Sequence, residues 1–448
     1  MEQHDDGAWR RDLNVIASPA QGIRDVLDLM PDATDDDRAA IALRLRNVPA
    51  ALAGYRESLR AGIAAADTPA LRQVEAVIEQ IERLTGDDGY FARLGTTADP
   101  ARTAYADLAR FLREELAPSA RTTDAVGRER YALASREFVG ATIDLDETYA
   151  WGLDNLREVV AEQERVAGRI VPGGGVREAI AALEADPSRA LHGTDALRVW
   201  MQETSDAAVD ALAGVHFDLP DPLRRLECRI APTQEGGIYY TPPSEDFARP
   251  GRMWWSVPVG VERFDTWREL TTVYHESVPG HHLQLGTAIL AADRLNAWRR
   301  LTWNSGHGEG WALYAERLMA DLGHLDDPAD RLGMLDAQRM RAARVVLDLG
   351  VHLGKPRPDG QGPWDADYAL AFMSEHVAMN APFIRFEVLR YLGWAGQAPS
   401  YAVGQRLWQQ LRDDWTSRHG DDLRRFHREA LAVGSVGMGT LREHLLAN

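Results

Sequence analysis

Hydrophobic residues recur at three- and four-residue steps over most of the first half of the chain. The repeat is clear in residues 70–84, 103–116 and 147–166, and this period places apolar side chains on one face of an α-helix. We therefore predict helices throughout residues 36–214. A glycine run at 171–178 interrupts the pattern and predicts a tight connection in which a glycine takes a positive φ.

The pattern changes between residues 215 and 262, where prolines cluster and short β-like runs appear. These runs are rich in aromatic and β-branched residues, as strands are; they read LECRIAP, GGIYYTP and RMWWSVPV. Helical periodicity resumes at Asp265 and continues to the end, apart from residues 354–363. Because helices and strands do not alternate, a doubly wound sheet is not expected. We predict a mainly helical fold with one small β-sheet.

Composition excludes several classes of partner and site. A formal net charge of −18 repels polyanions, so we expect neither a nucleic-acid partner nor binding to an anionic membrane. The single cysteine, Cys228, excludes an internal disulfide and a cysteine-rich zinc site. Residues 1–20 lack a basic segment followed by an apolar one, and no apolar run reaches the length of a membrane span. We therefore expect a cytoplasmic protein, while the oligomeric state stays undetermined.

The segment HESVPGHH, residues 275–282, concentrates three histidines and a glutamate in eight residues. His275 followed by Glu276 begins like the helical zinc-peptidase motif H-E-x-x-H, in which two histidines bind zinc and the glutamate acts as base. Position 279 is a proline here, so the second ligand must be sought further on, at His281 or His282. The alternative interpretation is three ordinary polar residues near a helix end.

A straight helix suits neither histidine. Residue i+7 lies roughly 10 Å further along the axis, and residue i+6 lies about 120° off the face. Pro279, however, removes the hydrogen bond to the carbonyl of His275, and Gly280 accepts unusual backbone angles. We therefore predict a break that brings His281 back toward the position of i+4, with His282 as the alternative ligand.

The third ligand is sought in GHGEGWALYAERL, residues 306–318, which offers Glu309 and Glu316. Zinc sites of this kind take a carboxylate from a second helix. We predict Glu309 as the ligand and Glu316 as an alternative ligand or as a partner that orients a histidine. Glu309 could instead be a favourable charge at a helix N-terminus. Zn²⁺ is the predicted cofactor, and another divalent ion is the alternative.

At this point the motifs resemble those of the DUF885 family of bacterial proteins. HESVPGHHLQ matches H-E-x-x-P-G-H-x-x-Q, and EGWALYAE matches E-G-W-x-x-Y-x-E. Three further segments match in the right order: YYTPPSEDFARPGRMWW, RAARVVLDLGVH and EVLRYLGWAGQAPSYAVG. The resemblance covers about residues 225–445. It implies a gluzincin-like, zincin-type helical body with the small sheet beside the active-site helix, similar in plan to the M3 and M32 metallopeptidases.

The resemblance also implies roles for individual residues. His275 and His281 match the ligand histidines, Glu309 the ligand carboxylate and Glu276 the general base. In that mechanism, zinc lowers the pKa of a bound water toward 7, and Glu276 takes its proton and later gives it to the leaving amine.

Residues outside these two motifs receive roles from the same resemblance. His352 and Tyr401 match positions suited to polarise a scissile carbonyl or its oxyanion. Tyr240 lies in a strand-like run and could line the cleft or bind substrate. Each has an alternative: a histidine is favoured near a helix end in any case, and a tyrosine can serve the core.

Arg344 and Arg390 are the candidates to clamp a substrate carboxylate through paired hydrogen bonds. Their alternative is a structural ion pair within a helix, with Asp348 four residues after Arg344 or Glu387 three residues before Arg390.

Together these observations predict a helical N-terminal region, 1–214, and a catalytic metallohydrolase region, 215–448. The expected function is zinc-dependent cleavage of an amide or peptide bond in a small peptide or amino-acid-like metabolite, as in a metallopeptidase or carboxypeptidase. One alternative is a metal-dependent biosynthetic enzyme that performs elimination, cyclisation or acyl transfer. A second is a non-enzymatic helical protein that binds a small ligand. The sequence distinguishes neither exo- from endo-cleavage nor one substrate from another.

Overall fold

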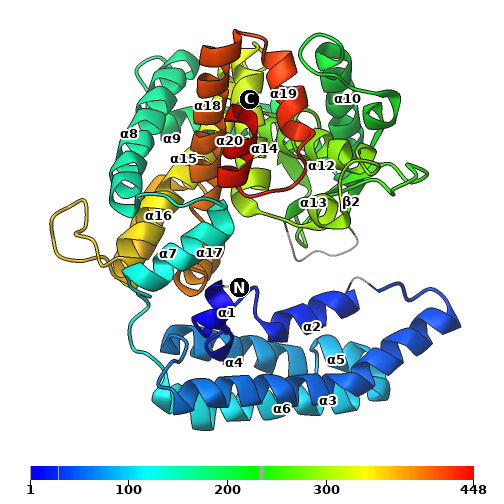
Figure 1. Ribbon diagram of the computed structural model, residues 1–448, viewed down its shortest axis with the longest axis vertical. Helices are drawn as coiled ribbons and strands as arrows, with labels where there is room; N and C mark the ends of the chain where they lie inside the picture. The colour runs from blue at the N-terminus through cyan, green and yellow to red at the C-terminus, as the bar shows by residue number, and fades with distance from the viewer. Residues whose placement is uncertain (1, 29, 232–236, 448) are drawn as a thin grey trace. The chain divides into compact units, whose positions relative to one another are not determined.

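A computed structural model describes residues 2–28, 30–231 and 237–447 and is mainly helical (Figure 1). The predicted fold class, a mainly helical chain with a small sheet, is confirmed. Pro232 and Gly236, at the ends of two predicted strand segments, lie outside the described residues. The chain forms two compact units, of which the first comprises residues 1–134, 347–375 and 379–395, and the second comprises 135–346, 376–378 and 396–448.

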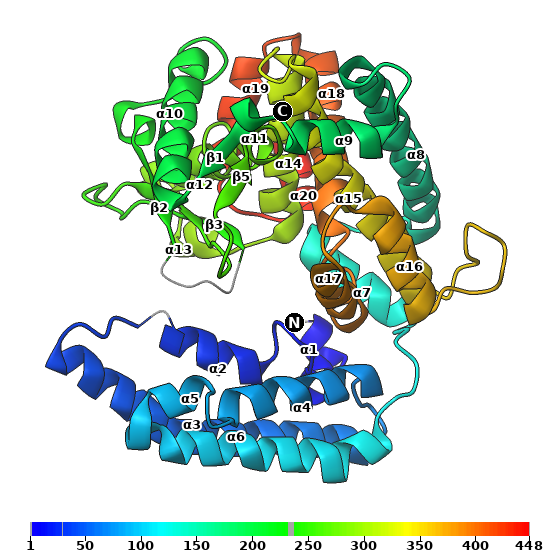
Figure 2. The same ribbon diagram turned by 180° about the vertical axis from the view of Figure 1, so that it is seen from behind.

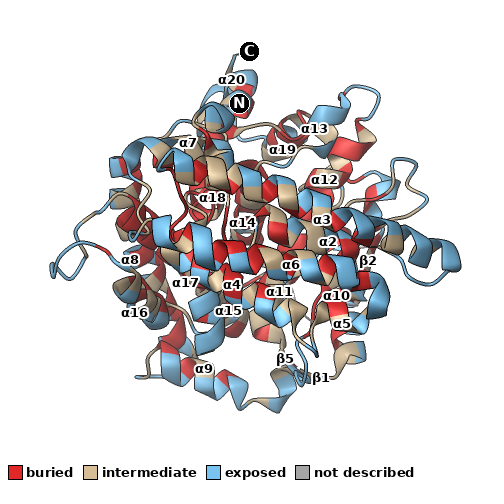
Figure 3. Ribbon diagram, turned by 90° about the horizontal axis from the view of Figure 1, so that it is seen from below, coloured by how far each residue is buried: buried red, intermediate tan, exposed pale blue. Residues whose placement is uncertain are grey.

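The first unit is built on long amphipathic helices. Bands of buried and exposed residues alternate along α3 and α6 (Figure 3), as the three- and four-residue repeat predicts. Tyr105, Leu108 and Val74 belong to the buried cluster that these helices share. The helices wholly within this unit are α1 (Glu2–Asp5), α2 (Pro19–Asp28), α3 (Asp35–Ala64), α4 (Leu71–Thr85), α5 (Tyr90–Arg93), α6 (Asp99–Phe111) and α17 (Ala381–Gly393).

Some helices have residues in both units, namely α7 (Arg128–Val139), α15 (Pro328–His352) and α16 (Ala366–His376). Short 3₁₀ segments lie at Ala8–Arg10, Gly95–Ala98, Ala117–Ser119, Pro187–Arg189 and Asp221–Arg224, and a π-helical turn at Leu112–Leu116.

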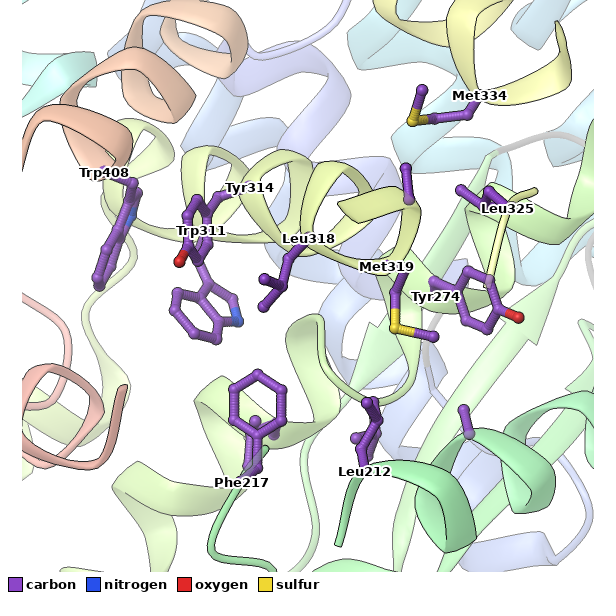
Figure 4. Close-up of a cluster of buried hydrophobic side chains, with 14 of the residues drawn as sticks. Leu212, Phe217, Tyr274, Trp311, Tyr314, Leu318, Met319, Leu325, Met334 and Trp408 are labelled. Carbon is purple, nitrogen blue, oxygen red and sulfur yellow. The ribbon is translucent and has the colours of Figure 1, made fainter. Parts of the chain in front are cut away.

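The second unit is organised around one buried helix, α14. Trp311, Tyr314 and Leu318 project from it into a cluster that also contains Trp408 and Phe217 (Figure 4). The helices wholly within this unit are α8 (Leu145–Ile170), α9 (Val176–Glu184), α10 (Thr194–Leu212), α11 (Thr266–Glu276), α12 (His281–Leu290), α13 (Ala297–Leu301), α14 (Ser305–Asp321), α18 (Ser400–His419), α19 (Leu423–Leu431) and α20 (Met438–Leu446).

Helices α14 and α18 approach each other closely because glycines face one another. A Cβ built on Gly310 would lie 2.5 Å from the carbonyl carbon of Gly404, which is closer than side chains permit. The glycine-rich start of α14 therefore serves packing as well as any role near the site.

The compact units do not divide at residue 214/215, where the sequence suggested a boundary. Helices α8, α9 and α10 precede that point but belong to the second unit. Val159, Leu183 and Leu212 on these helices share one buried cluster with Trp311. Their apolar faces are covered by the unit that contains α14, so the expected region 1–214 is divided near residue 135.

Two small sheets lie in the second unit (Figure 2). The three segments predicted to be strands form β2 (Leu226–Ile230), β3 (Ile238–Thr241) and β4 (Gly251–Trp255), in the order β2-β4-β3. β2 runs parallel to β4, and β3 runs antiparallel to it. The sheet formed by β1 (Ala190–His192) and β5 (Arg263–Asp265) was not predicted, because three residues are too few to show a periodicity.

Local features set both ends of α8, and the positive φ predicted within the glycine run is confirmed. Asp144 caps α8, its side chain accepting hydrogen bonds from the backbone amides of Asp146 and Glu147. Gly173, within the glycine run, has a φ of +79°. Within the described parts of the chain, no helix combines the length and apolar character needed to cross a membrane.

Candidate metal centre

The histidine-rich segment forms two helices separated by a short break. α11 ends at Glu276 and α12 begins at His281. Across the break the backbone hydrogen bonds span more residues than the four of an α-helix. The amide of Gly280 donates to the carbonyl of Tyr274, six residues earlier, and the amide of His282 to the carbonyl of Ser277, five residues earlier, both at 3.2 Å. The break predicted at Pro279 and Gly280 is therefore confirmed.

Tertiary contacts hold this break in one conformation. A Cβ at Gly280 would overlap the carbonyl oxygen of His275, so only glycine allows the close turn. The indole nitrogen of Trp311, on α14, donates to the carbonyl oxygens of Pro279 at 2.9 Å and Gly280 at 3.2 Å. The carbonyl of Gly280 also accepts from the backbone amide of Gln284 at 3.1 Å, so Trp311 matters most for the carbonyl of Pro279.

The break brings His275 and His281 together with Glu309 of α14. Oε2 of Glu309 lies 3.3 Å from Nε2 of His275 and 3.7 Å from Nε2 of His281. The imidazole rings are nearly perpendicular, at 89°, with centroids 4.7 Å apart. One donor atom from each of the three residues lies within 4.8 Å of the others, the only such cluster among the described residues.

Glu316 orients His275 by contacting the ring nitrogen that does not face Glu309. Its Oε1 lies 2.7 Å from Nδ1 of His275, and its Oε2 accepts a hydrogen bond from the hydroxyl of Thr271 at 2.7 Å. A carboxylate accepts from an N–H, so Nδ1 of His275 carries the proton and Nε2 is directed toward Glu309. Of the two roles considered for Glu316, the geometry matches the orienting partner.

The electrostatics of this cluster favour positive charge. Burial alone would lower the pKa of His275, but its hydrogen bonds to Glu309 and Glu316 outweigh burial and raise the pKa to about 10. Burial would raise the pKa of Glu309, but hydrogen bonds from His275 and His281 hold it far below its usual value. The carboxylates therefore stabilise positive charge on the imidazole of His275.

Glu276 lies beside the cluster as a buried carboxyl with an unused oxygen. Within the described structure, its Oε2 is buried without a hydrogen-bond partner. Burial raises the pKa of Glu276, while His281 and His275 act in the opposite direction. A buried acceptor without a partner is costly in a protein interior, so its presence here points to a function rather than to packing.

His282 is directed away from the three-residue cluster. Its Nε2 lies 2.9 Å from the carbonyl oxygen of Leu223, and its Nδ1 lies 2.8 Å from the hydroxyl of Tyr240. Burial lowers the pKa of His282 to about 4, so the ring is neutral: Nε2–H donates to the carbonyl and Nδ1 accepts from the tyrosine. Both ring nitrogens are engaged, which leaves His281 as the histidine near Glu309.

Arg344 and Tyr401 meet in the second unit. The Arg344 guanidinium carbon lies 5.2 Å from the ring centroid of Tyr401, a cation–π distance. Arg344, predicted to bind a substrate carboxylate, therefore lies against Tyr401, predicted to polarise the scissile carbonyl.

His352 and Arg390 belong to the first unit. Nε2 of the fully buried His352 lies 3.0 Å from the backbone carbonyl oxygen of Tyr391. Arg390 pairs with Glu387 through two hydrogen bonds of 3.2 and 2.8 Å, which is the helical ion pair considered as its alternative.

Two tryptophans near the cluster were not anticipated. Trp311 was noted only as part of the E-G-W motif, yet it bonds to the break in the histidine segment. Trp303 lies with its ring centroid 5.5 Å from that of His281. Its position five residues before Gly308, where a glycine permits an aromatic ring to lie on the helix, was the available signal.

The residues present fit a metal ion. Two imidazoles and one carboxylate are the donor set of many catalytic zinc sites. The histidine with a carboxylate on its second nitrogen and the adjacent carboxyl with an unused oxygen are the usual outer partners of such a site. The cluster is therefore a candidate site for a divalent metal.

A family model described as "Bacterial protein of unknown function (DUF885)" matches residues 1–445. The chain belongs to the DUF885 family. The resemblance first seen in the motifs of the second half thus extends across nearly the whole chain, including the N-terminal helices for which no motif was available. No curated protein matches this DUF885 chain significantly.

Solved structures share the fold of this DUF885 protein. One, titled as a "putative lipoprotein" from Colwellia psychrerythraea, has a TM-score of 0.84 and 24% identity, over 97% of this chain and 80% of that one. Another, titled as a "putative lipoprotein of unknown function" from Shewanella oneidensis, has a TM-score of 0.70 and 19% identity, over 98% and 83%. A carboxypeptidase from Pyrococcus furiosus has a TM-score of 0.40 and 11% identity, over 99% and 91%; this similarity is too low to bear on function.

Proposed function

We propose that this protein is a zinc-dependent hydrolase that cleaves an amide or peptide bond in a small peptide or an amino-acid-like substrate. The observation that carries the proposal is the convergence of His275, His281 and Glu309 within 4.8 Å, next to the buried and unpartnered Oε2 of Glu276. This combination of three ligands and one available base is the minimum set for metal-assisted hydrolysis.

His275 and His281 would hold the ion through Nε2, and Glu309 through Oε2, because these atoms face one another. Two imidazoles and a carboxylate suit zinc, with another divalent ion as the alternative. Zinc held there supplies Lewis-acid chemistry, which polarises a carbonyl and makes water more acidic at neutral pH.

Glu276 is the general base of the proposal. Its unpartnered oxygen accepts a proton from the attacking water and passes it to the nitrogen of the leaving amine, so the carboxylate is regenerated in each turnover. Glu316 keeps Nε2 of His275 directed inward by accepting the Nδ1 proton.

The proposal also gives roles to predicted residues outside the three-residue cluster and Glu276. Tyr401 is assigned to the scissile carbonyl, and Arg344 and Tyr240 to substrate binding, while the role of His352 stays an expectation from the resemblance. Arg390 is the least suited of the set to bind a substrate carboxylate, because Glu387 already engages its guanidinium. The cytoplasmic location also stays a prediction.

The test is metal analysis of protein never exposed to a chelator, followed by a screen of dipeptides and N-acyl amino acids. We expect about one zinc per chain and hydrolysis of at least one substrate class. Glu276→Gln should keep the metal but lose turnover, whereas Glu309→Ala should lose the metal. Zinc below a tenth of an equivalent would refute the site. Full zinc occupancy with no hydrolysis, but with another product, would favour the biosynthetic alternative.

A further inference from the structure

We propose that Trp303 forms the wall of a substrate subsite, and that the enzyme prefers substrates with an aromatic or other large apolar side chain next to the bond that is cleaved. This inference rests on the proposed function and names the substrate class of that same site. It is carried by the position, exposure and anchoring of one side chain.

Trp303 is unusually exposed for its type. It lies in the short segment between α13 and α14, and 48% of its surface is accessible. Tryptophan is highly buried on average, and a half-exposed indole is common where a binding surface needs apolar area at low cost in side-chain entropy.

The exposed ring lies directly beside a proposed metal ligand. The centroids of Trp303 and His281 are 5.5 Å apart, with an angle of 65° between the planes. A substrate group bound next to His281 is therefore within reach of the indole. Aromatic pairs favour centroid separations of 4.5–7 Å, so the ring is positioned to contact the substrate's next side chain.

Contacts of Trp303 and of the next residue, Asn304, hold this segment in place, so the proposed subsite wall exists before a ligand binds. The six-membered ring lies on Gly308, where a Cβ would overlap its Cη2 atom. The next residue, Asn304, caps α14 by accepting from the amide of His307 at 3.1 Å, and donates to the carbonyl of Glu137 at 2.9 Å. A held aromatic side chain loses little further freedom when a ligand binds.

The chemistry of the wall selects the ligand. The six-membered ring contacts Gly308 and the indole lies beside the imidazole of His281, while about half of the side chain stays accessible and offers mainly apolar ring surface. A large apolar side chain gains contact area there, and an aromatic one gains ring–ring contact in addition, whereas a glycine residue gains nothing. We expect about a tenfold preference for the aromatic ligand.

The test uses the full-length, zinc-loaded protein and two hydroxamates that bind zinc directly. Calorimetry compares phenylalanine hydroxamate with glycine hydroxamate, a readout that does not require turnover. Wild type should bind the aromatic probe about tenfold more tightly. Trp303→Ala should abolish that preference, and Trp303→Leu, which keeps a side chain on Gly308, should reduce it severalfold.

Trp298→Ala is the matched control, because Trp298 lies five residues earlier on α13 and is 72% exposed. It should leave the preference intact. An unchanged preference in both Trp303 variants would overturn the inference and leave the proposed function standing. If zinc-loaded protein bound neither hydroxamate, the proposed function itself would fail, and the inference with it.

Discussion

Nδ1 of His275 and Oε1 of Glu316 lie 2.7 Å apart, joining α11 to α14 in the buried core. The pair decides which nitrogen of the imidazole remains available. Because Glu316 accepts the Nδ1 proton, Nε2 of His275 is the nitrogen that faces Glu309 and that would give up its proton to bind a metal ion. A residue seven positions after Glu309 therefore controls the geometry of the cluster without belonging to it.

Glu316→Ala should weaken zinc binding by about 10- to 100-fold, because the histidine loses both its orientation and the carboxylate that increases its basicity. Competition with a chromophoric chelator measures this affinity. Asp321→Ala is the control, since it removes an exposed carboxylate from the end of the same helix. Equal affinities in the two variants would contradict the role given to Glu316.

Trp311→Phe should destabilise the protein by about 1–3 kcal/mol beyond the loss of ring volume, because the buried carbonyl of Pro279 loses its donor, whereas that of Gly280 keeps the amide of Gln284. Trp267→Phe is a matched control: Trp267 is equally buried, and its indole nitrogen has no hydrogen-bond partner in the described structure. Urea unfolding of both variants gives the comparison. A larger loss for Trp267→Phe would exclude a specific role for the Trp311 hydrogen bonds.

Gly280→Ala should cost several kcal/mol, in the range of severe core substitutions, because the new Cβ overlaps the carbonyl of His275. It should also lower zinc affinity by displacing one of the two histidines. Gly168→Ala is the opposite case: Gly168 is exposed within α8, and a Cβ there meets nothing within 4 Å. That variant should gain about 0.5–1 kcal/mol. Thermal unfolding distinguishes the two, and a Gly280→Ala protein as stable as wild type would show that the break can relax.

Acid should destabilise the second unit partly through His427. Burial, with smaller contributions from Arg412 and His216, lowers the pKa of His427 to about 3, and its Nε2 lies 2.9 Å from the hydroxyl of Tyr314. An unfolded histidine has a pKa near 6.5. Between these values the unfolded chain binds a proton that the folded chain does not, so stability falls as the pH falls below about 6.5.

The expected contribution of His427 is at most about 1.4 kcal/mol per pH unit, and it ends near pH 3. His427→Gln keeps an acceptor for Tyr314 but cannot take up a proton. The free energy of unfolding of this variant, measured from pH 7 to pH 4.5, should fall less steeply than that of wild type. Parallel curves would show that His427 is not the group responsible.

Much of the local structure could be predicted because its causes are local. Pro279 lacks an amide hydrogen and Gly280 lacks a side chain, and these two facts are sufficient to predict a helix break between His275 and His281. The strands β2, β3 and β4 follow from short aromatic and β-branched runs between prolines. The helical repeat likewise gives the apolar faces of α4 and α8.

Other features depend on residues distant in the sequence. The choice between His281 and His282 is made by Tyr240 and the carbonyl of Leu223, which occupy both nitrogens of His282. Glu309 faces Nε2 of His275 and Glu316 faces its Nδ1 because of the way α14 packs against α11. The sequence favoured His281 and Glu309 but left His282 and Glu316 as alternatives, because residue spacing describes one helix at a time.

By itself, the sequence determined the types of element, the break and the set of residues from which a metal site can be made. Tertiary structure alone decided which histidine meets Glu309, that Glu316 lies behind His275, and that α8 to α10 belong to the second unit. The physical reason is the range of the interactions. Backbone angles and amphipathic faces are set by neighbours along the chain, whereas a ligand cluster and a shared core require side chains from separate helices to meet.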